Sequence, residues 1–177
     1  MKKAIQLDPG SAELRAFLSW PLYLKGDFAG SLASANEAIR IEPDFWVAHM
    51  GAGFAFTSLR QFPEAIAEFQ KARTMNPEST LNLAGLAAVW AVGGERAEAV
   101  EMVSTLQKMA QSQYVSPMDV ALVHTALGDK DRAFQWLDRA FDDQAEMLLF
   151  LKRYPPFAAL RGDPRFATLL HRVGVAE

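Results

Sequence analysis

The sequence predicts an all-α protein, an α-solenoid of stacked helix–turn–helix hairpins closed by a C-terminal capping helical segment. Three observations support this prediction. Alanine is abundant while β-branched residues are sparse, which favours helix over strand. Several residue columns recur every 34 positions. Glycines and prolines fall where such helices would have to end.

Four columns share this period. Pro9, Pro43 and Pro77 are each 34 residues apart, and each follows an amphipathic stretch. The other three columns are Ser31, Ala65, Ala99 and Ala133; Gly26, Arg60, Gly94 and Gly128; and Ala4, Ala38, Ala72, Leu106 and Ala140. Because independent columns rarely share one period by chance, the chain is expected to be a repeat array.

Each column has a physical interpretation as part of a helical hairpin. Small residues in the Ser31 column let a second helix pack closely against a first one, and glycine in the Gly26 column suits the left-handed residue that ends a helix. Asp27 and Asp129 follow such glycines and are expected to be N-caps, while Pro43 and Pro77 stop the second helix. A single hairpin cannot bury its apolar face, so the hairpins must stack.

These residues resemble the tetratricopeptide repeat family over nearly the whole chain. The match is clearest at residues 46–79, where the positions of the family pattern hold Gly53, Phe56, Phe62, Ala65, Phe69, Ala72 and Pro77. The resemblance implies repeats at 12–45, 46–79, 80–113 and 114–147 in a single array. The second helix of 80–113 is expected to run on to about Gln113. The resemblance is specific for the fold and carries little information about function.

The two ends of the chain depart from the repeat. Residues 1–11 are expected to be the remnant of a preceding repeat, with Ala4, Ile5 and Leu7 covering the first complete hairpin. Residues 148–177 are expected to form the cap. There Asp163 and Pro164 predict the N-cap and first residue of a last helix. The run 157–170 resembles the closing segment of bacterial repeat proteins that are fused to regulatory domains, so the chain looks like the C-terminal part of such a protein.

Composition argues against several classes of function. The chain has 177 residues, a net charge of −3 and no cysteine, which weighs against a nucleic-acid binder and excludes a disulfide framework or a thiolate metal site. The first residues lack the apolar region of a signal peptide, and no apolar run approaches the roughly 18 residues of a spanning helix. We therefore expect a cytoplasmic protein that binds neither nucleic acid nor membrane.

No combination of residues predicts catalysis, a metal site or a cofactor. His49 and His124 are interpreted as hydrogen-bonded packing residues, and His171 as an exposed one. Neither a zinc-binding His-Glu-x-x-His spacing nor a Gly-x-Ser-x-Gly elbow occurs. Gly93-Gly94 is not followed by a lysine–serine pair and is interpreted as an interhelical turn. The chain is accordingly expected not to be an enzyme.

In the tetratricopeptide family, the first helices of the hairpins line a concave groove. The resemblance implies that a partner contacts Ala16, Trp20, Tyr23, Val47, Met50, Phe54, Thr57, Leu81, Met118 and Leu122. Family members that clamp a peptide carboxylate have Lys, Asn and Arg in such positions, and this sequence has none there. An apolar groove suits an amphipathic helix or an extended peptide. Alternatively, the chain's own C-terminal helix or a second copy fills it.

The sequence thus predicts a non-catalytic scaffold for an unidentified protein or peptide partner. The alternative is a self-associating module, a homodimer formed through the uncapped repeat ends or the groove. Basic residues near the C-terminus are interpreted as a scattered solvated face in preference to a surface for an acidic partner. They are Lys152, Arg153, Arg161, Arg165 and Arg172.

Overall fold

The computed structural model describes Asp8 and residues 10–176 of the chain. Within these residues it contains nine α-helices and two 3-10 helices, and no strand. The predicted all-α solenoid class is therefore confirmed. The predicted contacts of Ala4, Ile5 and Leu7 lie outside the described residues. The chain divides into two compact units, Met1–Asn82 and Leu83–Glu177, called the first unit and the second unit below.

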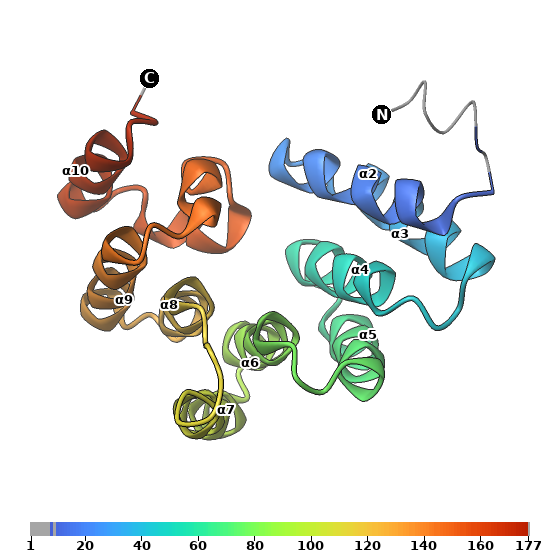
Figure 1. The fold of residues 1–177 in the computed structure, drawn as a ribbon, viewed down its shortest axis with the longest axis horizontal. Coiled ribbons are helices and arrows are strands. Elements are labelled where there is room, and N and C mark those ends of the chain that lie inside the picture. The colour runs from blue at the N-terminus through green and yellow to red at the C-terminus, as the bar shows by residue number, and fades with distance from the viewer. Residues whose placement is uncertain (1–7, 9, 177) are drawn as a thin grey trace. The chain divides into compact units, whose positions relative to one another are not determined.

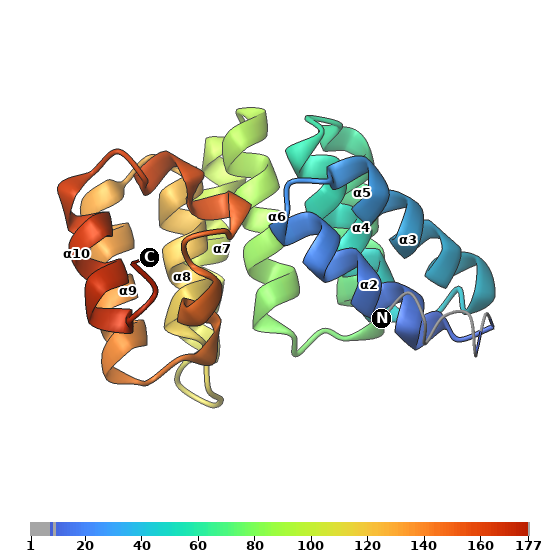
Figure 2. The same cartoon turned by 90° about the horizontal axis from the view of Figure 1, so that it is seen from above.

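The first unit is built from two helical hairpins. Its helices are α2 (Ala12–Leu24), α3 (Phe28–Ile41), α4 (Trp46–Ser58) and α5 (Phe62–Met75). Each packs against the next one in the sequence, and α2 also contacts α4. The two views of the ribbon show this pairing, with α2 beside α3 and α4 beside α5 (Figures 1 and 2).

The predicted turn chemistry is confirmed at the helix ends. Gly26, Gly94 and Gly128 all have positive φ, from +76° to +103°, and Arg60 takes the fourth place in this column with φ +61°. An arginine at this angle carries strain that glycine avoids, so the backbone geometry of the turn is retained even where the glycine is lost. Asp27 caps α3 by accepting the Gly30 N–H at 2.9 Å.

Paired helices meet through faces of small side chains. In α5 the buried residues are Ala65, Phe69 and Ala72, which share one face by their spacing. That face packs against α4, where a side chain on Gly53 would place its Cβ 2.9 Å from the Phe69 ring. Ala65 is fully buried, as are its counterparts in the later periods, Ala99 and Ala133. The small-residue column thus lies where the predicted close packing requires it.

The second unit begins within α6 (Thr80–Gly93), whose first residues belong to the first unit. It continues through α7 (Arg96–Met109), α8 (Pro117–Ala126) and α9 (Lys130–Asp142). The prediction that α7 runs to Gln113 is wrong. The helix ends at Met109, and the Met109 carbonyl accepts the N–H groups of both Ser112 and Gln113, which closes a turn.

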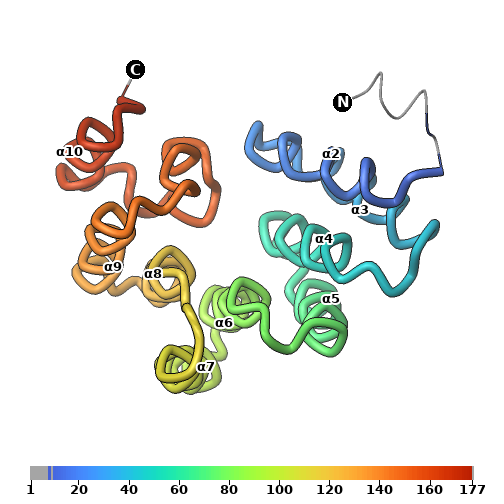
Figure 3. The backbone as a smooth tube through the Cα atoms, viewed as in Figure 1, coloured from blue at the N-terminus to red at the C-terminus, as the bar shows by residue number. Residues whose placement is uncertain are grey.

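The C-terminal segment folds back over the second unit. It consists of the 3-10 helices η1 (Glu146–Phe150) and η2 (Pro155–Leu160), followed by α10 (Pro164–Val173). The backbone trace leaves α9, turns through this segment and returns to α10 (Figure 3). The segment packs through η2 on α8 and through α10 on α9. Asp163 caps α10 and Pro164 is its first residue, as predicted.

A Gly53→Ala substitution tests the close approach of α4 and α5. The new Cβ meets the fully buried Phe69 ring, so we expect overpacking to cost about 1–3 kcal/mol of unfolding free energy. This cost exceeds the roughly 1 kcal/mol that alanine gains over glycine within a helix. Urea unfolding measures the difference. Gly10→Ala is the control, because its Cβ meets only ordinary contacts; an equal effect of both changes would contradict the packing described.

Candidate functional site

The predicted groove residues separate into two groups in the structure. Half of them are partly exposed: Trp20, Val47, Met50, Thr57 and Leu81. The other half are buried: Ala16, Tyr23, Phe54, Met118 and Leu122. The buried residues are core residues in this structure. Whether any of the ten contacts a partner stays a prediction.

The buried aromatic residues support the exposed ones. The Trp20 ring stacks on Tyr23 at 6.0 Å between centroids, and Tyr23 contacts the Phe54 ring at 5.9 Å. Phe54 in turn meets Phe69 edge-on at 5.0 Å. The Tyr23 hydroxyl accepts a hydrogen bond from Ser58 at 3.2 Å, and burial raises the pKa of Tyr23 well above its ordinary value. Trp20 therefore rests on a series of core rings.

Sequence reasoning missed Phe17. Its side chain on α2 is 49% exposed, more than any of the predicted groove residues that the structure leaves partly open. The signal was available, because Phe17 precedes Trp20 by three positions and so lies on the same helical face. We use the name first-unit apolar surface for the partly exposed set on α2 and α4 that consists of Trp20, Val47, Met50 and Thr57.

Charge is sparse along this surface. The sequence of α4 contains no acidic residue, lysine or arginine, and its one ionisable side chain, His49, is buried. On α2 the charged residues are Glu13 and Arg15, near the start of the helix. The first-unit apolar surface therefore offers aromatic and aliphatic contacts in place of an electrostatic anchor for a ligand.

The second unit covers its corresponding helix with its own chain. All residues of α8 from Pro117 to Thr125 are buried, including Met118 and Leu122. The C-terminal segment contributes to this burial through η2, whose Phe157 and Leu160 are fully buried. The sequence left open that the chain's own C-terminal helix fills the groove. In this structure the covering element on α8 is a 3-10 turn, while α10 packs on α9.

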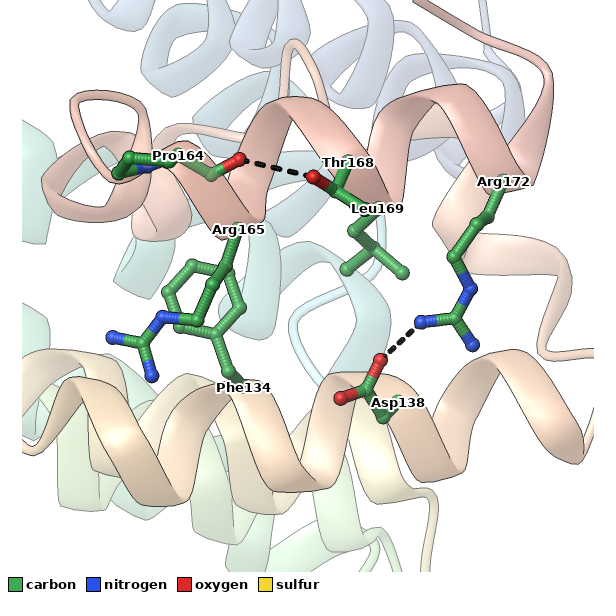
Figure 4. A pocket seen from close by; sticks show the side chains of 7 residues that line it. All are labelled: Phe134, Asp138, Pro164, Arg165, Thr168, Leu169 and Arg172. Carbon is green, nitrogen blue, oxygen red and sulfur yellow. Dashed lines mark hydrogen bonds and ion pairs between the residues drawn. The ribbon is translucent and has the colours of Figure 1, made fainter.

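A pocket of about 240 Å³ lies between α9 and α10 (Figure 4). Two arginines of α10, Arg165 and Arg172, flank it. The guanidinium of Arg165 lies 4.3 Å above the Phe134 ring, and that of Arg172 lies 4.3 Å above Phe141. Each arginine follows its aromatic partner by 31 positions, so the two contacts are the same contact repeated after seven residues, or two helical turns.

Both arginines are neutralised inside the second unit. Arg165 pairs with Asp131 at 2.8 Å and Arg172 pairs with Asp138, each at a separation of 34 positions. Arg165 also binds Asp163, and its hydrogen bonds lower the pKa of that carboxyl to about 2. Because aspartates already face them, these arginines attach α10 to α9 and do not form an open site for an anion.

The histidines differ in their surroundings. His171 is exposed, as predicted. His124 is buried, but its Nδ1 atom has no hydrogen bond and lies 3.9 Å from Asp129, so the prediction of a hydrogen-bonded histidine is wrong at that atom. Burial lowers the pKa of His124; Asp129 opposes this effect and Arg132 adds to it. His49 is buried and hydrogen-bonded through both ring nitrogens, as predicted.

Two other kinds of site are absent from the described part of the chain. Among residues 8 and 10–176, no three His, Cys, Asp or Glu side chains come together in a way that could hold a metal ion. Over the same residues, no helix has the length and apolar character needed to cross a membrane.

Solved structures with similar backbones are tetratricopeptide repeat proteins. A thermophilic TPR protein of Thermus thermophilus superposes with a TM-score of 0.65 at 19% identity, over 96% of this chain and 87% of that one. YrrB, described as a TPR protein with an unusual peptide-binding site, gives a TM-score of 0.56 at 15% identity, over 97% of this chain and 89% of that one. The fold is that of tetratricopeptide repeat proteins.

Sequence comparison gives a weak match. No family model matches the chain. The anaphase-promoting complex subunit cut9 of Schizosaccharomyces pombe is 21% identical over 139 residues, which is 78% of this chain. The chain spans about a fifth of the length of this curated relative (21%).

The tetratricopeptide fold explains why the recurring small-residue positions are buried. Gly53, Ala65 and Ala72 occupy pattern positions of the repeat, and all three lie in the packed interior of the first unit. Phe54 lies next to one of these positions and on the side of α4 that meets Phe69. The tetratricopeptide pattern therefore accounts for these buried positions of the core.

Phe54→Ala and Met50→Ala distinguish core from surface on α4. Phe54 is 4% exposed, so we expect its truncation to lower the unfolding free energy by about 3–5 kcal/mol. Met50 is partly exposed, so its truncation should cost clearly less. Urea unfolding followed by circular dichroism measures both. Equal, small losses would place Phe54 at the surface, as the groove prediction expects.

Proposed function

We propose that this chain is a non-catalytic protein-interaction scaffold that binds an apolar segment of a protein partner on its first-unit apolar surface. The observation that carries the proposal is the set of partly exposed side chains there, in which Trp20 stacks on the buried Tyr23 and Tyr23 contacts Phe54. Aromatic residues that stand on a rigid core lose little conformational freedom on binding and commonly serve as anchors.

The similar proteins support the same class of function. YrrB is described as having a peptide-binding site, and cut9 as a subunit of a multiprotein complex. We infer that the four predicted repeats, at 12–45, 46–79, 80–113 and 114–147, form one array with residues 148–177 as its cap. Binding is assigned to the first unit because the second unit covers Met118 and Leu122 with its own chain.

The ligand is inferred to be an amphipathic helix or an extended peptide with apolar anchors. The lack of lysine, arginine and asparagine on α4 argues against recognition of a terminal carboxylate. A non-catalytic role is supported by the buried histidine rings, since neither His49 nor His124 is accessible to a substrate in this structure. Exposed apolar side chains also suit a second copy of the chain, so self-association is the competing proposal.

Peptides selected from a random display library on the immobilised chain test the proposal. We expect Trp20→Ala and Met50→Ala each to lower the affinity for the selected peptides by about tenfold or more, because truncation of a central anchor typically has an effect of that size. Gln70→Ala, an exposed change on α5, is the control and should leave the affinity unchanged. Circular dichroism confirms that the variants retain their helices.

Two outcomes would contradict the proposal. If the affinity of the selected peptides is unchanged in Trp20→Ala and Met50→Ala, the binding site lies elsewhere. A chain that sediments as a dimer from low micromolar concentration, and returns to a monomer with Trp20→Ala, would show that the surface serves self-association.

A further inference from the structure

His49 lies at the centre of a buried polar contact in the first unit. Its ring is 3% exposed and projects from the first turn of α4. Its Nε2 atom lies 2.7 Å from the carbonyl oxygen of Pro43, in the turn between α3 and α4. Its Nδ1 atom is hydrogen-bonded to Oε2 of Glu68 on α5. The one ring thus joins the α3–α4 turn to α5.

The chemistry of the two partners determines how many protons this contact needs. A carbonyl oxygen only accepts hydrogen bonds, so Nε2 must carry a proton to bond Pro43. An ionised carboxylate also only accepts, so the bond to Glu68 needs a second proton, carried by Nδ1 or by the carboxyl group itself. A neutral imidazole beside an ionised Glu68 has only one N–H and can therefore make only one of the two bonds.

We propose that His49 and Glu68 share a bound proton that latches the α3–α4 turn to α5. The proton makes both hydrogen bonds possible at once. Without it, either the Pro43 carbonyl or the Glu68 carboxylate loses its partner on the ring, and an unpaired polar group in the interior lowers the stability of the first unit.

The surroundings favour a charged pair over an isolated charge. The second oxygen of Glu68 accepts a hydrogen bond from the Lys71 ammonium group at 2.8 Å. Charged residues on the elements that pack against α4 are Glu13 and Arg15 on α2, Glu37 and Arg40 on α3, Glu42 and Asp44 in the turn, and Glu64, Glu68, Lys71 and Arg73 on α5. Among these described residues, Glu68 is the one that forms an ion pair with the ring.

The latch lies beside the first-unit apolar surface but does not depend on the proposed function. His49 stands between Val47 and Met50 on α4, so the state of the latch bears on how firmly the start of that helix is held. The latch bears on the stability of the first unit whether or not a partner binds.

Nuclear magnetic resonance of the ring nitrogens tests the proposal on the unaltered chain. With the His49 imidazole labelled with ¹⁵N, we expect a proton on Nε2 and a second proton, shifted far downfield, in the hydrogen bond between Nδ1 and Glu68, whether that proton sits on the ring or on the carboxyl group. Glu68→Gln is the key variant. A glutamine amide donates to Nδ1 while Nε2–H donates to Pro43, so both bonds then form with a neutral ring and no shared proton.

Chemical unfolding gives the energetic test. Glu68→Gln keeps both hydrogen bonds of the ring and should leave the folding equilibrium of the first unit within about threefold. Glu68→Ala leaves Nδ1 without its partner and should lower that equilibrium by about tenfold or more. Glu64→Ala, which removes an exposed carboxylate on the same helix, is the control and should change the equilibrium little.

Two results would overturn the proposal. In the unaltered chain, a His49 ring with a proton on one nitrogen and no proton in the bond between Nδ1 and Glu68 would show that no proton is shared. An equal loss of stability in Glu68→Gln and Glu68→Ala would show that the donor of a glutamine amide does not replace the proton, which contradicts the proposal. If Glu68→Gln fails to fold, the nitrogen signals of the unaltered chain alone decide the question.

Discussion

The close approach of paired helices is the constraint on which the rest of the structure depends. It occurs where the sequence places a small residue every 34 positions, and Ala65, Ala99 and Ala133 in this column are fully buried. On α4, Gly53 lies opposite this face of α5, since a side chain at Gly53 would enter the space of the Phe69 ring. A hairpin packed this closely exposes a continuous apolar side, which only a neighbouring element can bury. The stacking of hairpins and the covering of α8 by η2 both follow from this need.

Features that depend on local chemistry were predictable from the sequence. Positive φ at Gly26, the cap at Asp27 and the helix start at Pro164 each involve only a few neighbouring residues. The outward faces of the first helices were not predictable in the same way. The helices α4 and α8 are apolar on nearly all sides, so their sequences do not show which apolar residue faces solvent. That is why the sequence does not separate Phe54 and Met118, which lie in the core, from residues that face solvent.

The first helices of the hairpins have different surroundings in the two units. In the second unit the chain's own 3-10 turn packs on α8, and paired arginines on α10 attach the closing helix to α9. In the first unit several apolar residues of α2 and α4 remain partly open, and Trp20 among them rests on a series of buried rings. Polar groups in the interior are few and specific, and the His49–Glu68 pair ties a turn to a neighbouring helix. The first unit thus combines a rigid base with an uncovered surface, which is the combination that partner binding requires.

The most direct test of this account is the unfolding free energy of Ala65→Leu compared with Ala67→Leu. Both positions lie on α5, but Ala65 faces α4 and Ala67 is exposed. If close helix approach governs the fold, leucine at 65 should overpack the hairpin and cost about 1–3 kcal/mol or prevent folding, while leucine at 67 should change stability by less than about 0.5 kcal/mol. Equal tolerance of leucine at the two positions would contradict the account, because the helices would then have room that the packing described here does not leave.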